Sequence, residues 1–191
     1  MAPVAAHRNT VNAILGTLYL ELREGGMLID AVRTCLVRDL EGLGAELDGY
    51  PDEASVWTDA PGFANSTGTL VLHCCGNLRY FVGAVLGGSA YVRARDAEFA
   101  TRDVSRAELQ LLLAVTGDEV VRGLDVVDRA TLGEPFPVEV MGGRLPTDRM
   151  LVHLVSHLAY HLGQADGHRR SVTGERKTVG ALSVGPLVAV S

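Results

Sequence analysis

The helical spacing of apolar residues is the feature that most constrains how this chain folds. Between Met27 and Leu47, apolar side chains recur mainly at steps of three and four residues, at Leu28, Val32, Cys35, Leu36, Leu40, Leu43 and Leu47. This spacing puts them on one face of an α-helix, whereas a half-buried strand would show strict alternation. Because the same periodicity runs through most of the chain, we predict an all-α fold.

Three more long helices follow from the same reasoning. One runs from about Ser66 to Leu86 and is apolar nearly all round, as is typical of a helix packed on several sides. The next begins where Ser105 and Glu108 fit a capping box, in which side chains satisfy the free amides at a helix start. Its apolar stripe consists of Leu109, Leu113, Val120, Leu124 and Val127. The last opens at residues 146–148 and runs to about residue 170. A shorter helical segment, residues 10–22, precedes a break predicted at Gly25-Gly26.

Long connections separate these helices. Residues 49–64 hold two prolines and two glycines and are predicted to form a loop, and residues 87–104 form a charged connection. Residues 132–145 are predicted to form a short hairpin or an extended loop, and the tail, 171–191, an extended arm packed on the bundle. No internal repeat is present. We therefore predict a single domain, 1–191, built as a four-helix bundle with long connections.

The charge balance argues against a nucleic-acid partner. Seventeen lysines and arginines stand against 23 aspartates and glutamates, giving a net charge of −6 and no basic stripe. The nearest basic cluster, His168-Arg169-Arg170 with Arg176-Lys177, is predicted to be solvated chain at and after a helix end.

Membrane insertion and secretion are not expected either. The most apolar stretch, residues 69–92, is interrupted by polar residues and glycines, and the N-terminus lacks the pattern of a secretory signal. Three cysteines, Cys35, Cys74 and Cys75, form no C-x-x-C spacing, so we expect reduced thiols in a cytoplasmic protein. The adjacent pair is predicted to serve core packing.

Three histidines on the last helix, His153, His157 and His161, are spaced by four residues. One helical turn brings the members of such a pair together, so a pair can bind one metal ion. His153 and His161 lie about 12 Å apart along the axis and cannot share an ion. On a helical wheel His161 lies about 70° from the apolar direction, His157 about 110° and His153 about 150°, so the 157/161 pair is nearer the bundle interior.

A zinc-type site needs a third ligand, for which His73 on the flank of the second helix is the best candidate. Asn77, one turn later, is a candidate to support the ligands through a hydrogen bond. Three neutral imidazoles with an open fourth position are typical of catalytic zinc. The alternative is that His73 is a hydrogen-bonded core residue and that the 157/161 spacing is incidental.

Other polar residues are given more ordinary roles. His7, His153 and His168 are expected at the surface, and the carboxylates of Asp96 and Glu98 in a solvated loop rather than as general bases. Asp166 lies either near the metal ligands or simply near the helix end. No Gly-x-Ser-x-Gly, P-loop or dinucleotide-binding motif is present.

The stretches NSTGTLVLHCCGNLRYFVGAVLGG, RARDAEF and LVHLVSHLAYHLGQ resemble the second helix, following loop and fourth helix of the DinB-like family of bacterial four-helix-bundle metalloproteins. ALSVGPLVAVS resembles the ending of one subgroup, although the tail lacks the tryptophan and Pro-Gly turn expected near residues 180–185. The resemblance implies metal ligation by His73, His157 and His161, a divalent metal such as zinc or nickel, and a homodimer. Some members transfer bacillithiol or mycothiol onto electrophiles.

The leading hypothesis is therefore a metal-dependent thiol S-transferase of the detoxification type. Arg79, Arg93 or Arg95 would bind carboxylates of the thiol cofactor, and no catalytic residue beyond the metal ligands is assigned. Two alternatives stay open. One is a hydrolase that uses metal-activated water. The other is a non-catalytic, stress-related bundle that binds a metal or small ligand.

Overall fold

The computed structural model describes residues 3–179 and 182–188, with side chains from residue 26 onward. It is 67% helical, and the described part contains no β-strand, which confirms the all-α prediction. The α-helices are α1 (Pro3–Asp48), α2 (Thr67–Leu78), α3 (Arg95–Ala100), α4 (Arg106–Asp125), α5 (Arg129–Gly133) and α6 (Thr147–Thr173). A π-helix, η2 (Arg79–Leu86), continues α2 directly, and two short 3₁₀ turns complete the set, η1 (Ala54–Trp57) and η3 (Gly185–Leu187).

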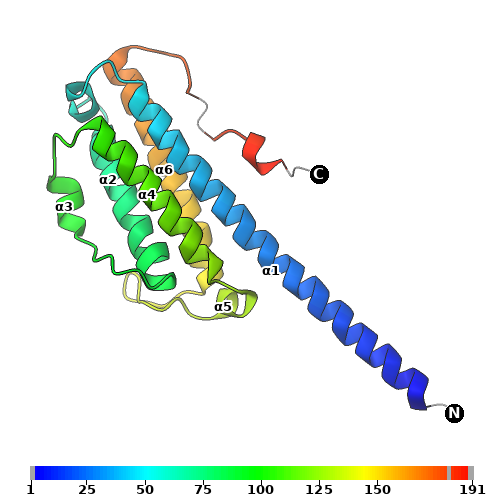
Figure 1. The fold of residues 1–191 in the computed structure, drawn as a ribbon. Helices are drawn as coiled ribbons and strands as arrows, with labels where there is room; N and C mark the ends of the chain where they lie inside the picture. The colour runs from blue at the N-terminus through cyan, green and yellow to red at the C-terminus, as the bar shows by residue number, and fades with distance from the viewer. Residues whose placement is uncertain (1–2, 180–181, 189–191) are drawn as a thin grey trace.

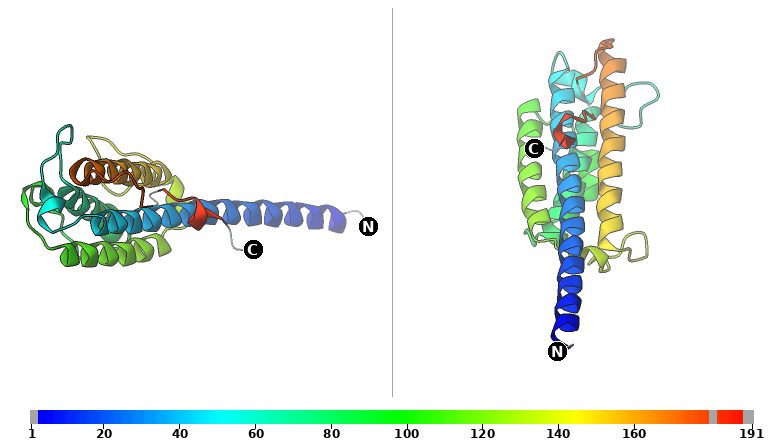
Figure 2. Two further views of the ribbon diagram at one scale, coloured as in Figure 1. Left: turned by 90° about the horizontal axis from the view of Figure 1, so that it is seen from above. Right: turned by 90° about the vertical axis from the view of Figure 1, so that its right-hand side faces the viewer.

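Four of these helices form the bundle (Figure 1). Helix α1 packs mainly on α4 and α6, and α2 packs on the same two helices, so α1 and α2 lie on a diagonal. The bundle therefore has four seams, α1/α4, α4/α2, α2/α6 and α6/α1. The short helices α3 and α5 lie outside this square, α3 against α2 and α5 against α1 and α6 (Figures 1 and 2).

The core consists mainly of the predicted apolar stripes. The α1 stripe is buried at Val32, Leu36, Leu40, Leu43 and Leu47, and the third predicted stripe is buried at all five positions from Leu109 to Val127. Each fully buried aliphatic side chain contributes about 1.5–3 kcal/mol relative to exposure. This burial, repeated along each helix, orients the four helices. It places the histidines of α2 and α6 at the seam between these two helices.

Helix α2 is apolar and long enough, together with η2, to cross a membrane by length and composition alone. Its 18-residue window has a mean hydropathy of 1.3, but 61% of that window is buried inside the bundle. Most of this segment is thus covered by protein. This is the behaviour of a core helix, as predicted from its all-round apolar character.

The predicted capping box at Ser105 is present, and two further helix ends are capped. Ser105 Oγ accepts from the Glu108 amide at 3.3 Å, and Glu108 accepts from the Ser105 amide at 3.1 Å, which confirms the capping box. Ser66 caps α2. Helix α6 ends where Gly174 adopts a left-handed conformation, φ +72°, that a side chain would disfavour.

The predicted break at Gly25-Gly26 is wrong, because α1 is one 46-residue helix that runs through both glycines. A glycine costs about 1 kcal/mol relative to alanine in a helix, yet it keeps its amide donor and helical dihedrals. The N-terminal part of α1 extends beyond the other bundle helices (Figures 1 and 2). His7 lies in this part, whose side chains are not described.

The connections contain more structure than predicted. Residues 87–104 hold α3, residues 132–133 belong to α5, and residues 134–146 make only isolated bridges, Pro135 with Pro146 and Val140 with Gly143. In the tail, residues 171–173 belong to α6, and beyond Gly174 the described residues have an irregular course with one 3₁₀ turn. The Ser183 carbonyl accepts from Arg38 at 3.3 Å, so the arm packs back on α1.

Candidate metal centre

Three histidines meet at the α2/α6 seam. His73 comes from α2, and His157 and His161 come from successive turns of α6. The Nε2 atom of His157 lies 3.3 Å from that of His73 and 3.2 Å from that of His161. All three candidate ligand atoms lie within 4.8 Å of one another, so the group could hold one metal ion. His153 is exposed, as predicted, and lies outside this group.

The spacing of these nitrogens matches a metal-binding geometry. Nitrogens that bind one tetrahedral zinc at about 2.0–2.1 Å lie about 3.3–3.4 Å apart. Both Nε2–Nε2 distances from His157 lie within about 0.2 Å of this value. The same spacing allows an N–H···N hydrogen bond, but His157 Nε2 can donate to only one of the two other rings.

Hydrogen bonds on the far side of two rings fix which nitrogen faces the centre. Nδ1 of His73 lies 2.9 Å from Glu98 Oε2, and Nδ1 of His161 lies 2.7 Å from Gln164 Oε1. Both oxygens accept, so each Nδ1 carries the proton and each Nε2 presents a lone pair. Because only one proton can sit on His157 Nε2, at least one of the two short nitrogen contacts sets lone pair against lone pair. A bound cation removes this conflict.

Two of the imidazoles at this seam, those of His157 and His161, have lowered pKa values and are held neutral. Burial lowers the pKa of His157 to about 4, assisted by the positive charges that His161 and His73 carry when protonated. Burial also lowers the pKa of His161, partly opposed by its hydrogen bond to Gln164. Neutral imidazole is the form that binds metals, so the residues fit a divalent cation near neutral pH.

Glu98 corrects the prediction of a solvated loop. Its side chain is 6% exposed and bridges His73 to Arg93, which donates to it at 2.7 and 2.9 Å. Burial alone would raise the pKa of Glu98, but the bonds from Arg93 and His73 outweigh it and lower the pKa. Glu98 is therefore ionised near neutral pH. Sequence reasoning missed it because six residues of α3 are too few to show a period.

The arginines proposed to bind a cofactor are differently placed. Arg79 is paired with Glu119 at 3.0–3.1 Å, and Arg93 with Glu98, so both are already neutralised. Arg95 is exposed and has no ion pair within the described part of the chain. Its guanidinium lies 5.0 Å from the ring centre of Phe99, and that ring lies 4.8 Å from His73.

Three other residues considered near the histidines do not belong to the cluster. Asn77 is buried, but its Oδ1 has no hydrogen-bond partner among the described residues, so His73 is supported by Glu98 instead. Asp166 pairs with Arg169 and Arg170 near the helix end. Asp96 is exposed, as predicted.

The adjacent cysteines are both buried, which bears out their predicted packing role. Burial raises the pKa of Cys74, and it raises that of Cys75 to about 12. Neither thiol is therefore a candidate nucleophile.

His168 and Arg169, predicted to be solvated, are both buried. His168 Nδ1 lies 2.6 Å from the Tyr50 hydroxyl, and its Nε2 donates to the Thr58 carbonyl at 2.8 Å. Arg169 forms a buried ion pair with Glu46. His168 and Arg169 follow the buried Ala165 by three and four residues, so they lie on the same face of α6. Arg176 and Lys177 are exposed, as predicted.

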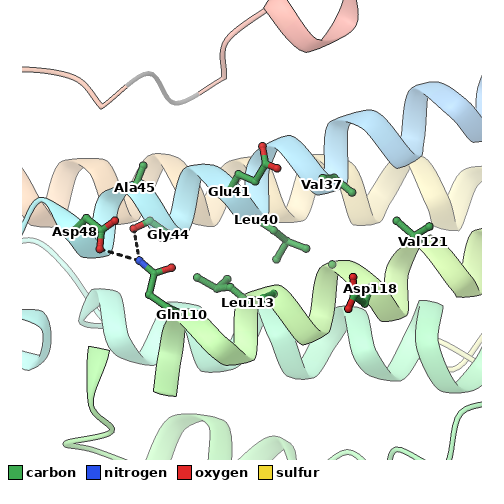
Figure 3. A pocket seen from close by; sticks show the side chains of 12 residues that line it. Val37, Leu40, Glu41, Gly44, Ala45, Asp48, Gln110, Leu113, Asp118 and Val121 are labelled. Atoms are coloured by element: carbon green, nitrogen blue, oxygen red, sulfur yellow. Dashed lines mark hydrogen bonds between the residues drawn. The ribbon is translucent and has the colours of Figure 1, made fainter. Parts of the chain in front are cut away.

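A separate cavity lies at the α1/α4 seam (Figure 3). It is a groove of about 590 Å³ with an apolar floor that includes Leu40 and Leu113 and an acidic rim of Glu41, Asp48 and Asp118. It contains no histidine or cysteine, and its seam does not include α2 or α6. The groove therefore plays no part in the candidate metal centre.

Comparison with known proteins identifies the family of this chain. The family model for mycothiol-S-transferase matches residues 31–174. Neither the curated proteins nor the solved structures include a match. The match ends before the arm, so the resemblance of the last residues to one subgroup stays a prediction. It spans about three quarters of the chain, including the whole histidine cluster and Glu98. The chain therefore belongs to the mycothiol-S-transferase family, within the DinB-like superfamily.

Proposed function

We propose that this protein is a metal-dependent S-transferase that joins mycothiol to small electrophiles, with His73, His157 and His161 as the metal ligands. One observation carries the proposal. Three imidazole nitrogens converge at ligand spacing, and no fourth His, Cys, Asp or Glu joins the group in the described part of the chain. Three protein ligands with an open position are typical of catalytic rather than structural sites.

The ligand set favours zinc or nickel. Imidazole suits both ions, and three neutral ligands leave the 2+ charge of the ion uncompensated. When bound, the metal would supply a Lewis acid that lowers the pKa of the mycothiol thiol. The thiol proton leaves to solvent, the sulfur forms a bond to the electrophilic carbon, and the leaving group departs from that carbon with its electron pair.

The residues around the open side of the cluster would receive the substrates. His157 and His161 are half-buried, so the cluster is reachable from solvent. A hollow of about 380 Å³ lined by Arg95, Asp96, Phe99 and Ala100 lies beside His73, because Phe99 contacts both. Arg95 is the one predicted cofactor-binding arginine that is not already paired, so we assign it to an anionic group of a substrate.

The two alternatives receive less support. A hydrolase needs a carboxylate free to take a proton from water, and Glu98, the carboxylate that contacts the cluster, is already bonded by Arg93 and His73. A non-catalytic binding protein is favoured by a sealed or four-ligand site, and the half-buried histidines do not match that description.

The remaining expectations belong to the same proposal. We propose that residues 1–191 act as a single domain, in a homodimer, in the cytoplasm, with detoxification of electrophiles as the role. Nucleic acid and membranes are not expected partners, because the chain has a net charge of −6 and its most apolar helix is packed in the core.

Elemental analysis of the untagged protein tests the proposal first. We expect about one zinc or nickel per chain, lost in His157→Ala and retained in His153→Ala. The second variant is a matched control, since it removes an exposed histidine one turn away on the same helix. Loss of mycothiol and of an electrophile is then followed with and without reconstituted metal.

Two results would contradict the proposal. A wild-type protein that takes up no metal after reconstitution with zinc or nickel has no metal centre. Thiol consumption that proceeds equally well in the metal-free protein would exclude a metal-dependent transfer. Ester or amide hydrolysis without added thiol would favour the hydrolase.

A further inference from the structure

We infer that α3 supports the metal centre through Glu98, a positioning residue that fixes the tautomer of His73. Residue 76 must then be glycine, because the Glu98 carboxylate occupies the space that a side chain at this position would fill. The part that concerns metal affinity rests on the proposed function. The part that concerns the His73 tautomer does not. We call His73, Gly76, Arg93 and Glu98 the Glu98 clamp.

Both oxygens of Glu98 are committed within the clamp. Oε1 accepts from Arg93 Nε at 2.7 Å, and Oε2 accepts from Arg93 Nη2 at 2.9 Å and contacts His73 Nδ1 at 2.9 Å. An ionised carboxylate can only accept, so His73 Nδ1 must donate. When the ring is neutral, its lone pair is on Nε2, the atom that faces His157. Glu98 thereby selects the tautomer that can bind a metal.

Gly76 supplies the room for this arrangement. It lies three residues after His73 on α2, and a Cβ at this position would overlap Glu98 Oε1 and lie 2.6 Å from its Cδ. The atoms that would meet the Cβ all belong to the Glu98 side chain. An alanine here is therefore accommodated by expelling Glu98, while α2 itself gains helix propensity.

Helix α3 depends on the clamp for its position. Its six residues are too few for a helix to be stable alone, and α2 is the bundle helix on which it packs. Besides the Glu98 bonds, Phe99 rests on the His73 ring with the ring centres 4.8 Å apart. The contacts that order α3 are thus contacts with a metal ligand. We expect α3 and the metal centre to stabilise each other.

A matched pair of glutamates separates this role from simple stability. Glu119 on α4 is held by Arg79 through the same two-bond geometry and is also largely buried, but it does not contact a histidine. Glu119→Gln therefore weakens a comparable ion pair at a distance from the metal ligands. It is the control for Glu98→Gln, and Gly76→Ala provides an independent route to the same loss.

The first measurement is the tautomer of His73 in the metal-free protein, from the nitrogen chemical shifts of its ring. We expect a single Nδ1–H form in the wild type and in Glu119→Gln. In Glu98→Gln and Gly76→Ala we expect a mixture of tautomers, because a glutamine amide can either accept or donate and an expelled carboxylate does neither. A purely structural Glu98 would leave the His73 signals unchanged.

The second measurement is zinc affinity by chelator competition. Loss of a group that orients a metal-bound histidine typically lowers affinity about 10- to 100-fold. We expect a fall in this range for Glu98→Gln and Gly76→Ala and none for Glu119→Gln, with helical circular dichroism intact in all three.

The clamp is overturned if both clamp variants keep a single Nδ1–H tautomer, or if their zinc affinity equals that of Glu119→Gln. If the wild type binds neither zinc nor nickel, the proposed function fails. The tautomer measurement then still decides whether Glu98 positions His73.

Discussion

The two ends of the α2/α6 seam each carry buried histidine, and they differ in what is left unsatisfied. At the end near the start of α2, His168 is fully buried, and both its nitrogens are bonded by protein, Nδ1 by Tyr50 and Nε2 by the Thr58 carbonyl. At the other end, His73 and His161 use Nδ1 for protein bonds and turn Nε2 toward His157.

Burial alone therefore does not distinguish a structural histidine from a candidate metal ligand. The distinction lies in whether a ring nitrogen keeps a lone pair that no hydrogen bond uses. His168 is the more buried residue, and its hydrogen-bonding capacity is fully used. The cluster at the other end has acceptors facing acceptors, which costs free energy until a cation binds. One end of the seam thus has a structural histidine, and the other has the proposed metal site.

The largest expected effect is stabilisation by metal. A ligand at 1,000 times its Kd stabilises a folded protein by about 4 kcal/mol. We expect a gain of this order on adding zinc to the metal-free wild type and to His168→Ala, and almost none in His161→Ala. Chemical denaturation with and without zinc measures it. If His161→Ala gained as much as the wild type, the comparison between the two ends would fail.

Replacement of His168 tests the other end. Removing its ring leaves a cavity and unpaired groups on Tyr50 and Thr58, so His168→Ala should lower the free energy of unfolding by about 2–4 kcal/mol. Its metal content should equal that of the wild type. Denaturant titration and elemental analysis of the same preparation check both parts. A loss of metal together with stability would show that the ends are not independent.

The pH dependence of stability tests the same comparison. Burial lowers the pKa of His168 from 6.5, against weaker opposing contributions from its bond to Thr58 and from Asp59. Below pH 6.5 the unfolded state binds more protons at this residue, so stability falls as pH drops from there toward the folded pKa. His168→Gln removes this contribution. The metal-free variant should therefore lose less stability than the metal-free wild type between pH 7 and pH 5, and an equal loss would contradict the assignment.

Removing Arg95 should have a smaller effect, limited to the substrates. Arg95→Ala removes an exposed, unpaired guanidinium, so the free energy of unfolding should change by less than about 0.5 kcal/mol. If the arginine contacts an anionic substrate, KM should rise several-fold with the metal content unchanged. Steady-state kinetics with the reconstituted protein measure this. An unchanged KM for every anionic electrophile tested would remove Arg95 from the site.

The sequence contained the bundle and the histidine cluster in readable form, because both depend on local periodicity. The apolar stripes on α1 and α4 and the capping box at Ser105 are properties of successive turns, and a helical wheel converts them into faces. The same wheel separated His157 and His161 from the outward His153. His73 required only that its helix lie next to the last one.

The tertiary structure alone decided the roles of Glu98, Gly76 and His168. Glu98 reaches His73 from a six-residue helix 25 positions away, and this contact requires the space that Gly76 leaves on α2. His168 looked like a surface residue because its partners, Tyr50 and Thr58, come from a loop more than 100 residues earlier. Periodicity reports which way a side chain points along its own helix. Which groups meet it there is set by packing between distant segments, and that is where the chemistry of this protein was determined.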